Sequence, residues 1–403
     1  MENKPKVVMM GLGYIGLPTA ALIASRGLNV IGVDIREEVV ETINKGKIHI
    51  VEPDLDGLVH HVVKEGYLKA SISPEEADVY LIAVPTPFKE NHVPDLSYVS
   101  SAVRKIIPTL KKGSLVILES TSPVGTTHKI QYLIKKERPE LDGNIFIAYC
   151  PERVLPGNII HELKHNQRAI GGIDEISTQK AITFYKHFVV GELHATNSKT
   201  AEMVKLVENA SRDNQIAFAN ELSMICDKAG IDVWELIRLA NKHPRVNILR
   251  PGTGVGGHCI AVDPWFIVSE FPEEAQLIKK SREINNYKTQ WALERIKNTA
   301  LEFKLEHGRD AVIGCLGLAF KPDIDDLRES PALYVAEQLN AQGFKTMEVE
   351  PNLENPTDRK LFTTQETILK ADIIVYLVGH KGFKNLQIEN TKKVLDFVGI
   401  DSN

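Results

Sequence analysis

The stretch that decides the fold is Lys6–Ile35, "KVVMMGLGYIGLPTAALIASRGLNVIGVDI". It begins with an apolar, β-rich run and turns at Gly11, Gly13 and Gly16. A helical stretch follows, ends at Gly27, and leads into a second apolar run. This order of strand, turn, helix and strand predicts a parallel sheet covered by helices.

The glycine spacing GxGxxG means little alone, but here it follows an expected strand and opens an expected helix. Asp34 closes the next strand, 18 residues past Gly16. A tight turn, close approach to a pyrophosphate at a helix N-terminus and a carboxylate for ribose hydroxyls together form the dinucleotide fingerprint. Asp34 would repel a 2′-phosphate, which favours NAD over NADP, whereas Arg36 could accommodate that phosphate. We expect NAD to bind at Gly11, Gly13, Tyr14, Ile15, Gly16, Asp34 and Arg36.

Two further loops follow expected strands, "VPTPF" around Thr86 and "ESTSPVGTT" around Thr121. Ligands bind at the carboxyl ends of such strands, so both threonines are candidate NAD contacts. The same residues are also typical of ordinary Pro- and Thr-rich turns, and the sequence leaves both interpretations open.

The alternation of strands and helices appears twice along the chain. Strands are expected in "DVYLIAV", "SLVILES" and "IFIAYCPE", and a long helical pattern runs from Thr200 to about Glu235. After a second helical stretch over 275–301, the rhythm returns with "DAVIGCLGLAF", "SPALYVAEQLNAQG", "KTMEVEP" and "ADIIVYLVGH". The predicted fold class is α/β, with two Rossmann-like parallel-sheet domains joined by a long-helix central segment. The expected boundaries are 1–198, 199–300 and 301–403.

Composition excludes several classes of protein. The 48 Lys and Arg residues are interspersed with 53 Asp and Glu residues, and the net charge of −5 gives no footprint for nucleic acid. The four cysteines are far apart and form no CxxC pair, which indicates neither a disulfide framework nor a metal site. No signal peptide or apolar run long enough for a membrane span is evident. We expect a cytoplasmic protein with no membrane or nucleic-acid partner.

One cysteine stands apart. Cys259 lies in "GVGGHCIAVDPW", residues 254–265, behind a glycine-rich stretch and four residues before Asp263. Glycines remove side-chain bulk, so this thiol is either accessible to a bound molecule or a small apolar residue at a strand start.

Several motifs together resemble one family. "GLGYIGLP", "VPTP", "STSPVGTT", "CPERVLPG", "EMVKLVENASRD", "GGHCIAVDP" and "FKPDIDDLRESP" are similar, in order and spacing, to the UDP-glucose/GDP-mannose 6-dehydrogenases. The resemblance spans nearly the whole chain and weakens after about Asp358. Through "IHIVEPDL", "HPRVNILRPGTGVGGHCIAVDPWFIV" and "GLAFKPDIDDLRESPA" it is greatest for the branch that oxidises UDP-N-acetyl-mannosamine.

The resemblance implies a homodimer or higher oligomer with an N-terminal NAD domain, a helical dimerisation segment and a C-terminal UDP-sugar domain. It implies oxidation of a primary alcohol to a carboxylate by two hydride transfers. Between them a thiolate would hold the aldehyde as a thiohemiacetal, whose oxidation gives a thioester. Cys259 would be that nucleophile, whereas the role of His258 stays open.

The resemblance also assigns the remaining site residues. Lys205 and Asn209 share one helix face and would act on the C6 oxygen. Asp263 would be an acid/base partner or water holder, Glu152 a base for thioester hydrolysis, and Arg328 a cofactor contact. Arginines suit an anionic diphosphate and a product carboxylate. The implied substrate contacts are Arg153, Val154, Lys205, Asn209, Arg212, His243, Arg245, Gly256, Phe320 and Lys321.

Other functions are open on the sequence. The segments "ERVLPG" and "GHC" depart from relatives that oxidise UDP-glucose, so another nucleotide sugar such as UDP-glucose or UDP-N-acetyl-glucosamine stays an alternative. A silent NAD-binding protein would not need Cys259, Lys205 and Asp263. A two-electron 3-hydroxyacid-type dehydrogenase would need neither the cysteine nor a third α/β segment.

Overall fold

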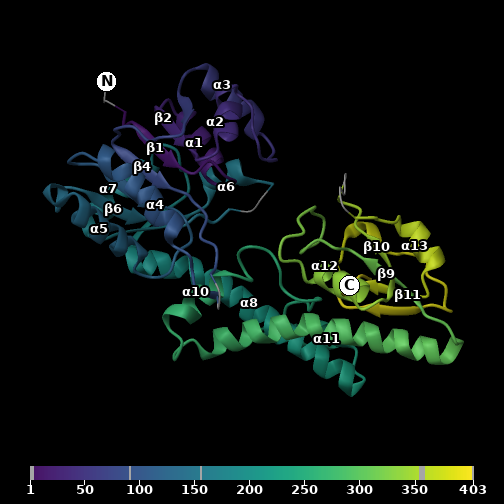
Figure 1. Cartoon of the computed structure of the whole chain (residues 1–403). Helices are drawn as coiled ribbons and strands as arrows, with labels where there is room; N and C mark the ends of the chain where they lie inside the picture. Colours follow the sequence, from purple (N-terminus) through teal and green to yellow (C-terminus); the bar gives the residue numbers. More distant parts are fainter. Residues whose placement is uncertain (1–3, 90–91, 155–156, 354–358, 402–403) are drawn as a thin grey trace. The chain divides into compact units, whose positions relative to one another are not determined.

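The computed structural model describes residues 4–89, 92–154, 157–353 and 359–401. It divides into two compact units, 1–207 and 208–403. Each unit contains a twisted sheet with helices packed against it (Figure 1). The boundary between the units falls inside the long helix α8 (Ser198–Ala229).

The first unit is built around an eight-stranded sheet in the order β3-β2-β1-β4-β5-β6-β7-β8. Its first six strands have the order typical of dinucleotide-binding domains. The strands are β1 (Val7–Met10), β2 (Val30–Val33), β3 (Leu68–Ser71), β4 (Val79–Ile82), β5 (Leu115–Leu118), β6 (Phe146–Tyr149), β7 (Arg168–Gly172) and β8 (Leu193–Asn197). The helices are α1 (Gly16–Ala24), α2 (Glu37–Asn44), α3 (Leu55–Lys64), α4 (Ser97–Ile106), α5 (Thr126–Glu137), α6 (Ile159–His165) and α7 (Glu175–Tyr185).

One junction of this sheet differs from the expected parallel arrangement. Strand β7 pairs antiparallel with β6, through Ala148 opposite Gly172 and Tyr149 opposite Gly171, and β8 then pairs parallel with β7. The two added strands therefore run against the other six. Every other pairing of the described sheet is parallel, so the α/β class predicted from the sequence is confirmed.

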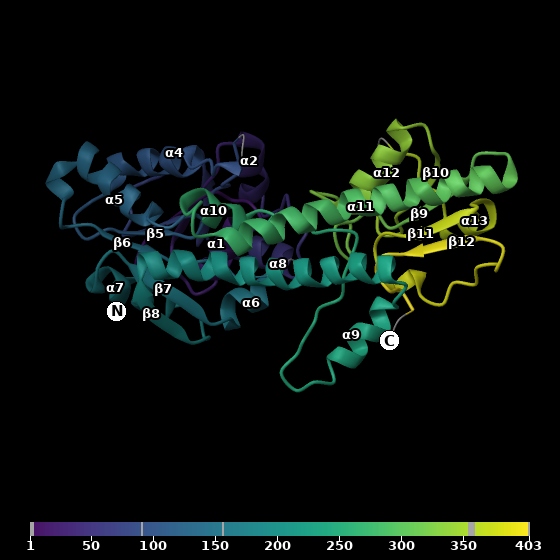
Figure 2. The same cartoon turned by 90° about the horizontal axis from the view of Figure 1, so that it is seen from below.

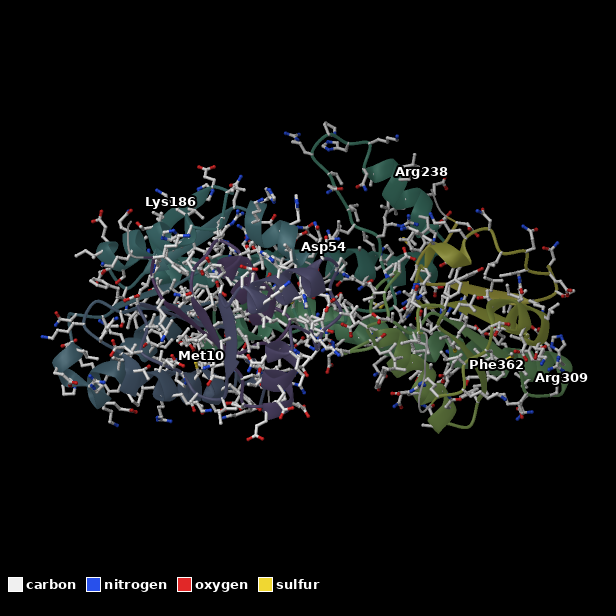
Figure 3. The ribbon with its side chains drawn as sticks, turned by 90° about the horizontal axis from the view of Figure 1, so that it is seen from above. Met10, Asp54, Lys186, Arg238, Arg309 and Phe362 are labelled. Atoms are coloured by element: carbon white, nitrogen blue, oxygen red, sulfur yellow. The ribbon has the colours of Figure 1, made fainter. Side chains whose placement is uncertain are left out.

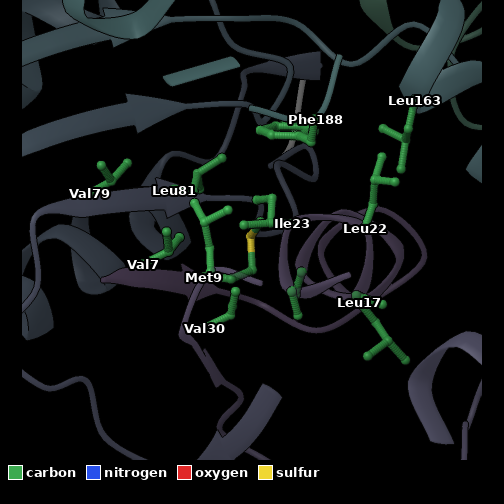
Figure 4. Close-up of a cluster of buried hydrophobic side chains, with 14 of the residues drawn as sticks. Val7, Met9, Leu17, Leu22, Ile23, Val30, Val79, Leu81, Leu163 and Phe188 are labelled. Carbon is green, nitrogen blue, oxygen red and sulfur yellow. The ribbon is translucent and has the colours of Figure 1, made fainter. Parts of the chain in front are cut away.

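Successive residues of each central strand face opposite layers of helices, because side chains alternate along a strand. Val7 and Met9 of β1 pack into one apolar cluster with α1, α3, α6 and α7, whereas Val8 and Met10 face the other cluster with α4 and α5. Figure 4 shows the first cluster, where Met9 and Ile23 meet between the sheet and α1. Both faces are covered, as a parallel sheet requires.

The long helical pattern expected from Thr200 to about Glu235 is two helices. Helix α8 ends at Ala229 because Gly230 takes a left-handed backbone (φ +67°), the usual end of a helix. A second helix, α9 (Val233–Ala240), then starts from Asp232, whose carboxylate accepts a hydrogen bond from the Trp234 N–H at 2.9 Å. Side chains of α9 such as Arg238 extend into solvent (Figure 3).

The second unit has a four-stranded parallel sheet in the order β10-β9-β11-β12. The strands are β9 (Val312–Leu316), β10 (Lys345–Val349), β11 (Ile373–Tyr376) and β12 (Lys393–Asp396). The remaining helices are α10 (Asp263–Glu270), α11 (Gln276–His307), α12 (Pro331–Ala341) and α13 (Thr364–Lys370). Helices α11 and α12 cover one face of the sheet through apolar residues such as Ile296 and Val335.

Within this unit, residues of α8 and α11 lie side by side (Figure 2). A buried polar network joins them: Arg282 donates to the Asp213 carboxylate at 2.6 Å, and Asn285 donates to the same oxygen at 2.7 Å. Asn220 donates to Asn285 and accepts from the backbone N–H of Gly252 at 2.9 Å. In the parts of the chain that the structure describes, no helix is both long and apolar enough to cross a membrane.

Candidate active site

In the glycine turn after β1, two glycines have no room for a side chain and the third faces open space. Gly11 has φ +94°, and a Cβ there would lie 2.4 Å from the Ala83 carbonyl oxygen. A Cβ on Gly16 would lie 1.9 Å from the Gly11 oxygen, so both positions exclude a side chain. A Cβ on Gly13 would meet nothing within 4 Å. The open side at Gly13 fits the close approach of a dinucleotide.

Asp34 lies over this turn, as the fingerprint predicts. Its Oδ2 accepts from the Leu12 N–H at 3.1 Å, and its Oδ1 accepts from the Arg36 N–H at 3.0 Å. The exposed Arg36 side chain lies 3.5 Å from Oδ1, so its charge faces the aspartate. Tyr14 is exposed beside the turn, and Ile15 is the N-cap of α1, which has no side-chain cap. The first turn of α1 is therefore open to an anion.

The loops after β4 and β5 are joined to each other. The Thr86 hydroxyl donates to the Thr121 carbonyl oxygen at 2.8 Å, and Ser120 Oγ accepts from the Val84 N–H at 2.9 Å. Both predicted threonines therefore lie at the carboxyl edge of the first sheet, beside β1 and its glycine turn.

Glu202 is a residue that the sequence did not single out. It is fully buried on α8, and its carboxylate accepts from the N–H groups of Gly125 (2.6 Å) and Thr127 (2.7 Å) and from the Thr127 hydroxyl (2.6 Å). A carboxylate at the first turn of α5 satisfies its open N–H groups and its dipole. Lys205, three residues further along α8, is buried too.

The thiol loop of the second unit exposes Cys259, whereas the cysteines at 150, 226 and 315 are buried. Of the two interpretations that the glycine stretch left open, the structure shows the accessible thiol. The Cys259 carbonyl oxygen accepts from the N–H groups of Val262 (3.1 Å) and Asp263 (2.8 Å), a turn that leads directly into α10. Asp263 is buried, and its carboxylate accepts from Asn209 Nδ2 at 2.5 Å. Asn209, Asp263 and Cys259 therefore come together, although 50 residues separate Asn209 from the cysteine.

The glycines of this loop allow another segment of the same chain to pack closely against them. A Cβ on Gly256 would lie 2.3 Å from the Glu329 carbonyl oxygen and 2.9 Å from Phe320 Cβ. Gly257 has φ +82°, and its Cβ would lie 2.8 Å from Phe320 Cε2. The sequence suggested that these glycines admit a ligand, and the structure adds that they admit Phe320. Lys321 follows on the same loop, with its Nζ 5.7 Å from the Phe320 ring centre.

The charge of Arg328 acts on His258. Burial lowers the pKa of His258, and the positive charge of Arg328 lowers it further. His258 is therefore mainly neutral at pH 7 and supplies little charge to stabilise a thiolate. Arg328 makes a bidentate ion pair with Asp326, at 2.6 Å for its shortest contact, and its carbonyl oxygen accepts from the Gly257 N–H.

The remaining candidate residues lie elsewhere in the two units. Glu152 follows β6 and accepts from the Val154 N–H, while Arg153 donates to the Gln167 carbonyl oxygen at 3.0 Å. Arg212 is exposed on α8. His243 and Arg245 are exposed on a turn after α9, where the Arg245 N–H donates to His243 Nδ1 at 3.3 Å.

The fold and the geometry define a class of protein. The first unit has the strand order, glycine turn and carboxylate of a dinucleotide-binding domain. The second unit presents an exposed thiol beside a buried aspartate, on a second α/β sheet. A chain with these features is a dinucleotide-dependent oxidoreductase, and its second unit exposes the thiol of Cys259.

Comparison with known proteins identifies the family. The sequence matches the model of the UDP-glucose/GDP-mannose dehydrogenase family in three parts: the NAD binding domain over 5–189, the central domain over 199–287 and the UDP binding domain over 314–400. The chain belongs to this family. The family resemblance, the dehydrogenase class and NAD as cofactor, all expected from the sequence, are confirmed.

Two curated relatives and one solved structure are similar over nearly the whole chain. The UDP-N-acetyl-D-mannosamine dehydrogenase of Campylobacter jejuni is 54% identical over 98% of this chain and 100% of its own length. The NDP-N-acetyl-D-galactosaminuronic acid dehydrogenase of Ralstonia nicotianae is 50% identical over 98% of this chain and 96% of its own. The structure of UDP-D-ManNAc dehydrogenase from Pyrococcus horikoshii superimposes with a TM-score of 0.86 at 38% identity, covering 98% and 96% of the two chains.

Proposed function

We propose that this enzyme oxidises the C6 alcohol of UDP-N-acetyl-mannosamine to the carboxylate in two NAD-dependent steps, through a covalent intermediate on Cys259. The observation that carries the proposal is the exposed Cys259 next to the buried Asp263, which is hydrogen-bonded to Asn209, in a chain 54% identical to a UDP-N-acetyl-D-mannosamine dehydrogenase. The name of that relative supplies the sugar, and the loop supplies the nucleophile.

NAD fits the first unit, because the turn is open at Gly13 and the first turn of α1 has no side-chain cap. Its nicotinamide accepts one hydride in each of the two oxidations. On this proposal Gly11, Gly13, Tyr14, Ile15 and Gly16 hold the pyrophosphate. Asp34, beside Arg36, holds the adenosine ribose, while Thr86, Thr121 and Arg328 are the remaining cofactor contacts.

The protein side of the chemistry is proton and oxygen handling. In the first oxidation Lys205 and Asn209 bind the C6 oxygen as its proton leaves. The Cys259 thiolate then adds to the aldehyde carbon, and the new oxygen is protonated to give a thiohemiacetal. Loss of the C6 hydrogen as hydride, with loss of the hydroxyl proton, gives a thioester. Water then attacks the thioester carbon, the thiolate leaves, and Asp263 or Glu152 takes the proton from the water.

The same proposal assigns the substrate site and the assembly. The contacts to the UDP-sugar are Arg153, Val154, Lys205, Asn209, Arg212, His243, Arg245, Gly256, Phe320 and Lys321. We retain the division into NAD (1–198), central dimerisation (199–300) and nucleotide-sugar (301–403) segments, in a cytoplasmic homodimer or higher oligomer. Arg245 lies on an exposed turn and would reach the active site of a neighbouring subunit.

A panel of UDP-sugars with NAD tests the proposal. UDP-N-acetyl-mannosamine should give two NADH per carboxylate, and brief reaction followed by denaturation should leave sugar-nucleotide mass on the peptide that carries Cys259. Cys259→Ala should still bind NAD and UDP but should yield at most a trace of NADH, since thioester formation no longer draws the first step forward. Cys226→Ala, which changes a buried cysteine, is the matched control. Normal two-NADH turnover by Cys259→Ala would refute the covalent route.

The 50% identity to a galactosaminuronate-named relative supports a second candidate, the same oxidation of an N-acetyl-galactosamine nucleotide. The two candidates share every step above and differ only in the sugar ring. A higher kcat/KM for the galacto sugar in the same panel would favour this second candidate.

A further inference from the structure

The loop after β9 carries Phe320 and Lys321, and it occupies the place in the second sheet that the glycine turn occupies in the first. Gly317 opens it with φ +91°, where a Cβ would lie 2.5 Å from Val378 Cβ. In the first unit Asp34 follows β2 and lies over its turn. The acidic residue that follows the equivalent strand, β10, is Glu350.

Glu350 differs from Asp34 in what it binds. Its Oε2 accepts from the N–H groups of Leu318 (2.7 Å) and Ala319 (2.9 Å) and from His380 Nε2 (3.0 Å). Its Oε1 accepts from the backbone and side-chain nitrogens of Asn352, at 3.1 and 3.2 Å. A carboxylate offers about four lone-pair positions, so none is left for ribose hydroxyls. Glu350 holds the loop of its own chain rather than a ligand.

This carboxylate is charged in the folded protein. Burial alone would raise the pKa of Glu350, but hydrogen bonds from His380 and from the N–H groups of Leu318 and Ala319 outweigh burial and hold the pKa below its usual value. The loop N–H groups therefore face an anion, which makes their hydrogen bonds stronger than bonds to a neutral acceptor.

His380 links Glu350 to Asp323, at the other end of the 317–323 loop. Its ring is buried, and Nδ1 accepts from the Asp323 backbone N–H at 2.9 Å. A backbone N–H can only donate, so Nδ1 carries no proton and Nε2–H donates to Glu350. Asp323 has a left-handed backbone (φ +60°), and its carboxylate accepts from the Lys381 N–H at 2.9 Å. Such a conformation at a non-glycine residue persists when its surroundings hold it in place.

Phe320 lies between these two anchors and reaches the thiol loop. Its backbone N–H donates to the Asp326 carbonyl oxygen at 3.0 Å, and its ring fills the space that the glycine at 257 leaves open. Gly257 lies two residues before Cys259. A shift of the 317–323 loop would therefore move both the nucleotide-side contacts and the support of the nucleophile.

We propose that Glu350 and His380 are positioning residues: they fix the 317–323 loop so that Phe320 and Lys321 meet the uridine nucleotide and Phe320 supports the Cys259 loop. This inference rests on the proposed function for the role of Phe320 and Lys321. It adds to the proposed site two residues, 30 apart in sequence, that do not contact the substrate themselves but hold the residues that do.

Glu350→Gln tests the first residue. The glutamine amide keeps the shape of the side chain, but its NH2 group would face N–H groups that now donate to the carboxylate. UDP binding, measured by titration calorimetry, should weaken about tenfold, the scale of losing a charged acceptor. NAD affinity should stay within about twofold, since separate sites rarely couple. Alkylation of Cys259 by iodoacetamide should change in rate as well.

Glu348→Gln is the matched control. Glu348 lies on β10, two residues before Glu350, is also buried and is ion-paired, at 2.7 Å to Arg359, but it does not bind the loop. It should leave UDP affinity and alkylation unchanged even where it lowers Tm. UDP affinity unchanged in Glu350→Gln, or equally reduced in Glu348→Gln, would overturn the inference.

Two amides dissect His380. Asparagine places an acceptor where Nδ1 meets Asp323, and glutamine places a donor where Nε2 meets Glu350. Both variants should bind UDP with affinities between those of the unmodified enzyme and His380→Ala. If folded His380→Ala binds UDP normally, or if neither amide improves on alanine, the ring acts through packing alone and the positioning role is refuted.

The readout separates this inference from the proposed function. UDP is the probe, so the result does not depend on which sugar is oxidised. If no UDP-sugar is turned over but Glu350→Gln still weakens UDP binding, the proposed function fails and the inference stands. If turnover is as proposed and UDP affinity is unmoved, the inference alone fails.

Discussion

Replacing Lys288 by methionine should stabilise the second unit at neutral pH. Lys288 lies on α11 with 1% of its side chain exposed, its Nζ donates to Ser223 Oγ at 2.8 Å, and it sits 3.8 Å from the centre of the Trp291 ring. Burial lowers the pKa of Lys288 to about 7, because an ammonium loses its hydration there. The folded state therefore disfavours the charged form that the unfolded chain keeps.

The sign and size follow from proton binding. Below about pH 7 both states hold the proton, and the unfavourable contribution of Lys288 is fully present. Between about pH 7 and the unfolded pKa near 10.4, the unfolded state binds one proton more, so the free energy of unfolding rises by about 1.4 kcal/mol per pH unit. From pH 7 to 9 this is about 2–3 kcal/mol.

Tryptophan fluorescence measures the effect in the correct unit, because all three tryptophans, Trp234, Trp265 and Trp291, lie within residues 208–403. Guanidinium unfolding should be followed at pH 7, 8 and 9 at constant ionic strength. The unmodified protein should gain stability with pH relative to Lys288→Met, and Lys279→Met, an exposed lysine of the same helix, should follow the unmodified protein. Parallel curves for the unmodified protein and Lys288→Met would refute the reasoning.

Three other outcomes can be tested. Asp34→Ala should weaken NAD binding by about 1–3 kcal/mol, the value of a hydrogen bond to a charged group, and an unchanged calorimetric affinity would contradict this. Glu202→Gln should cost the first unit about 1–2 kcal/mol and speed hydrogen exchange at the Thr127 amide, because a donor then faces the start of α5; unaltered exchange would argue against the cap. Arg282→Met should cost the second unit about 3–5 kcal/mol by leaving the Asp213 carboxylate buried without its cation, and adding Asp213→Asn should recover part of the loss; equal stability of single and double variants would exclude this explanation.

Local patterns made the first half of the fold predictable. The glycine turn and Asp34 lie within one strand–helix–strand unit, and each position has a local reason, so the sequence alone predicted the NAD-binding domain that the family model places over 5–189. The end of α8 also had local signals, since Gly230 ends that helix and Asp232 caps the next one. The helical pattern continues on both sides of these residues, so the break between the two helices was not recognised in the sequence. Strands β7 and β8 are mixed in polarity, which explains why the antiparallel junction was not expected.

The candidate site depended on contacts between distant segments. Nothing in the sequence marks Glu202 or Glu350 among 53 acidic residues, because their partners lie about 75 and 32 residues away. Asn209 and Asp263 were expected through resemblance to the family, and their hydrogen bond appears only in the structure. The packing of Phe320 against Gly257 could not be predicted, because loop glycines have many causes and the sequence does not distinguish them.

The cap that Glu202 places on α5 also affects which helix N-terminus is free to bind an anion. Helices α1 and α5 both begin at the carboxyl edge of the first sheet, after β1 and β5. The N-terminus of α5 is already neutralised from within by Glu202, whereas α1 has neither a side-chain cap nor an acidic residue in its first turn. A pyrophosphate therefore has α1 rather than α5 to bind, and Asp34 lies on one side of it with Thr86 and Thr121 on the other. On the proposed function, the adenosine of NAD would then lie toward Asp34 and β2 and the nicotinamide toward the loops after β4 and β5.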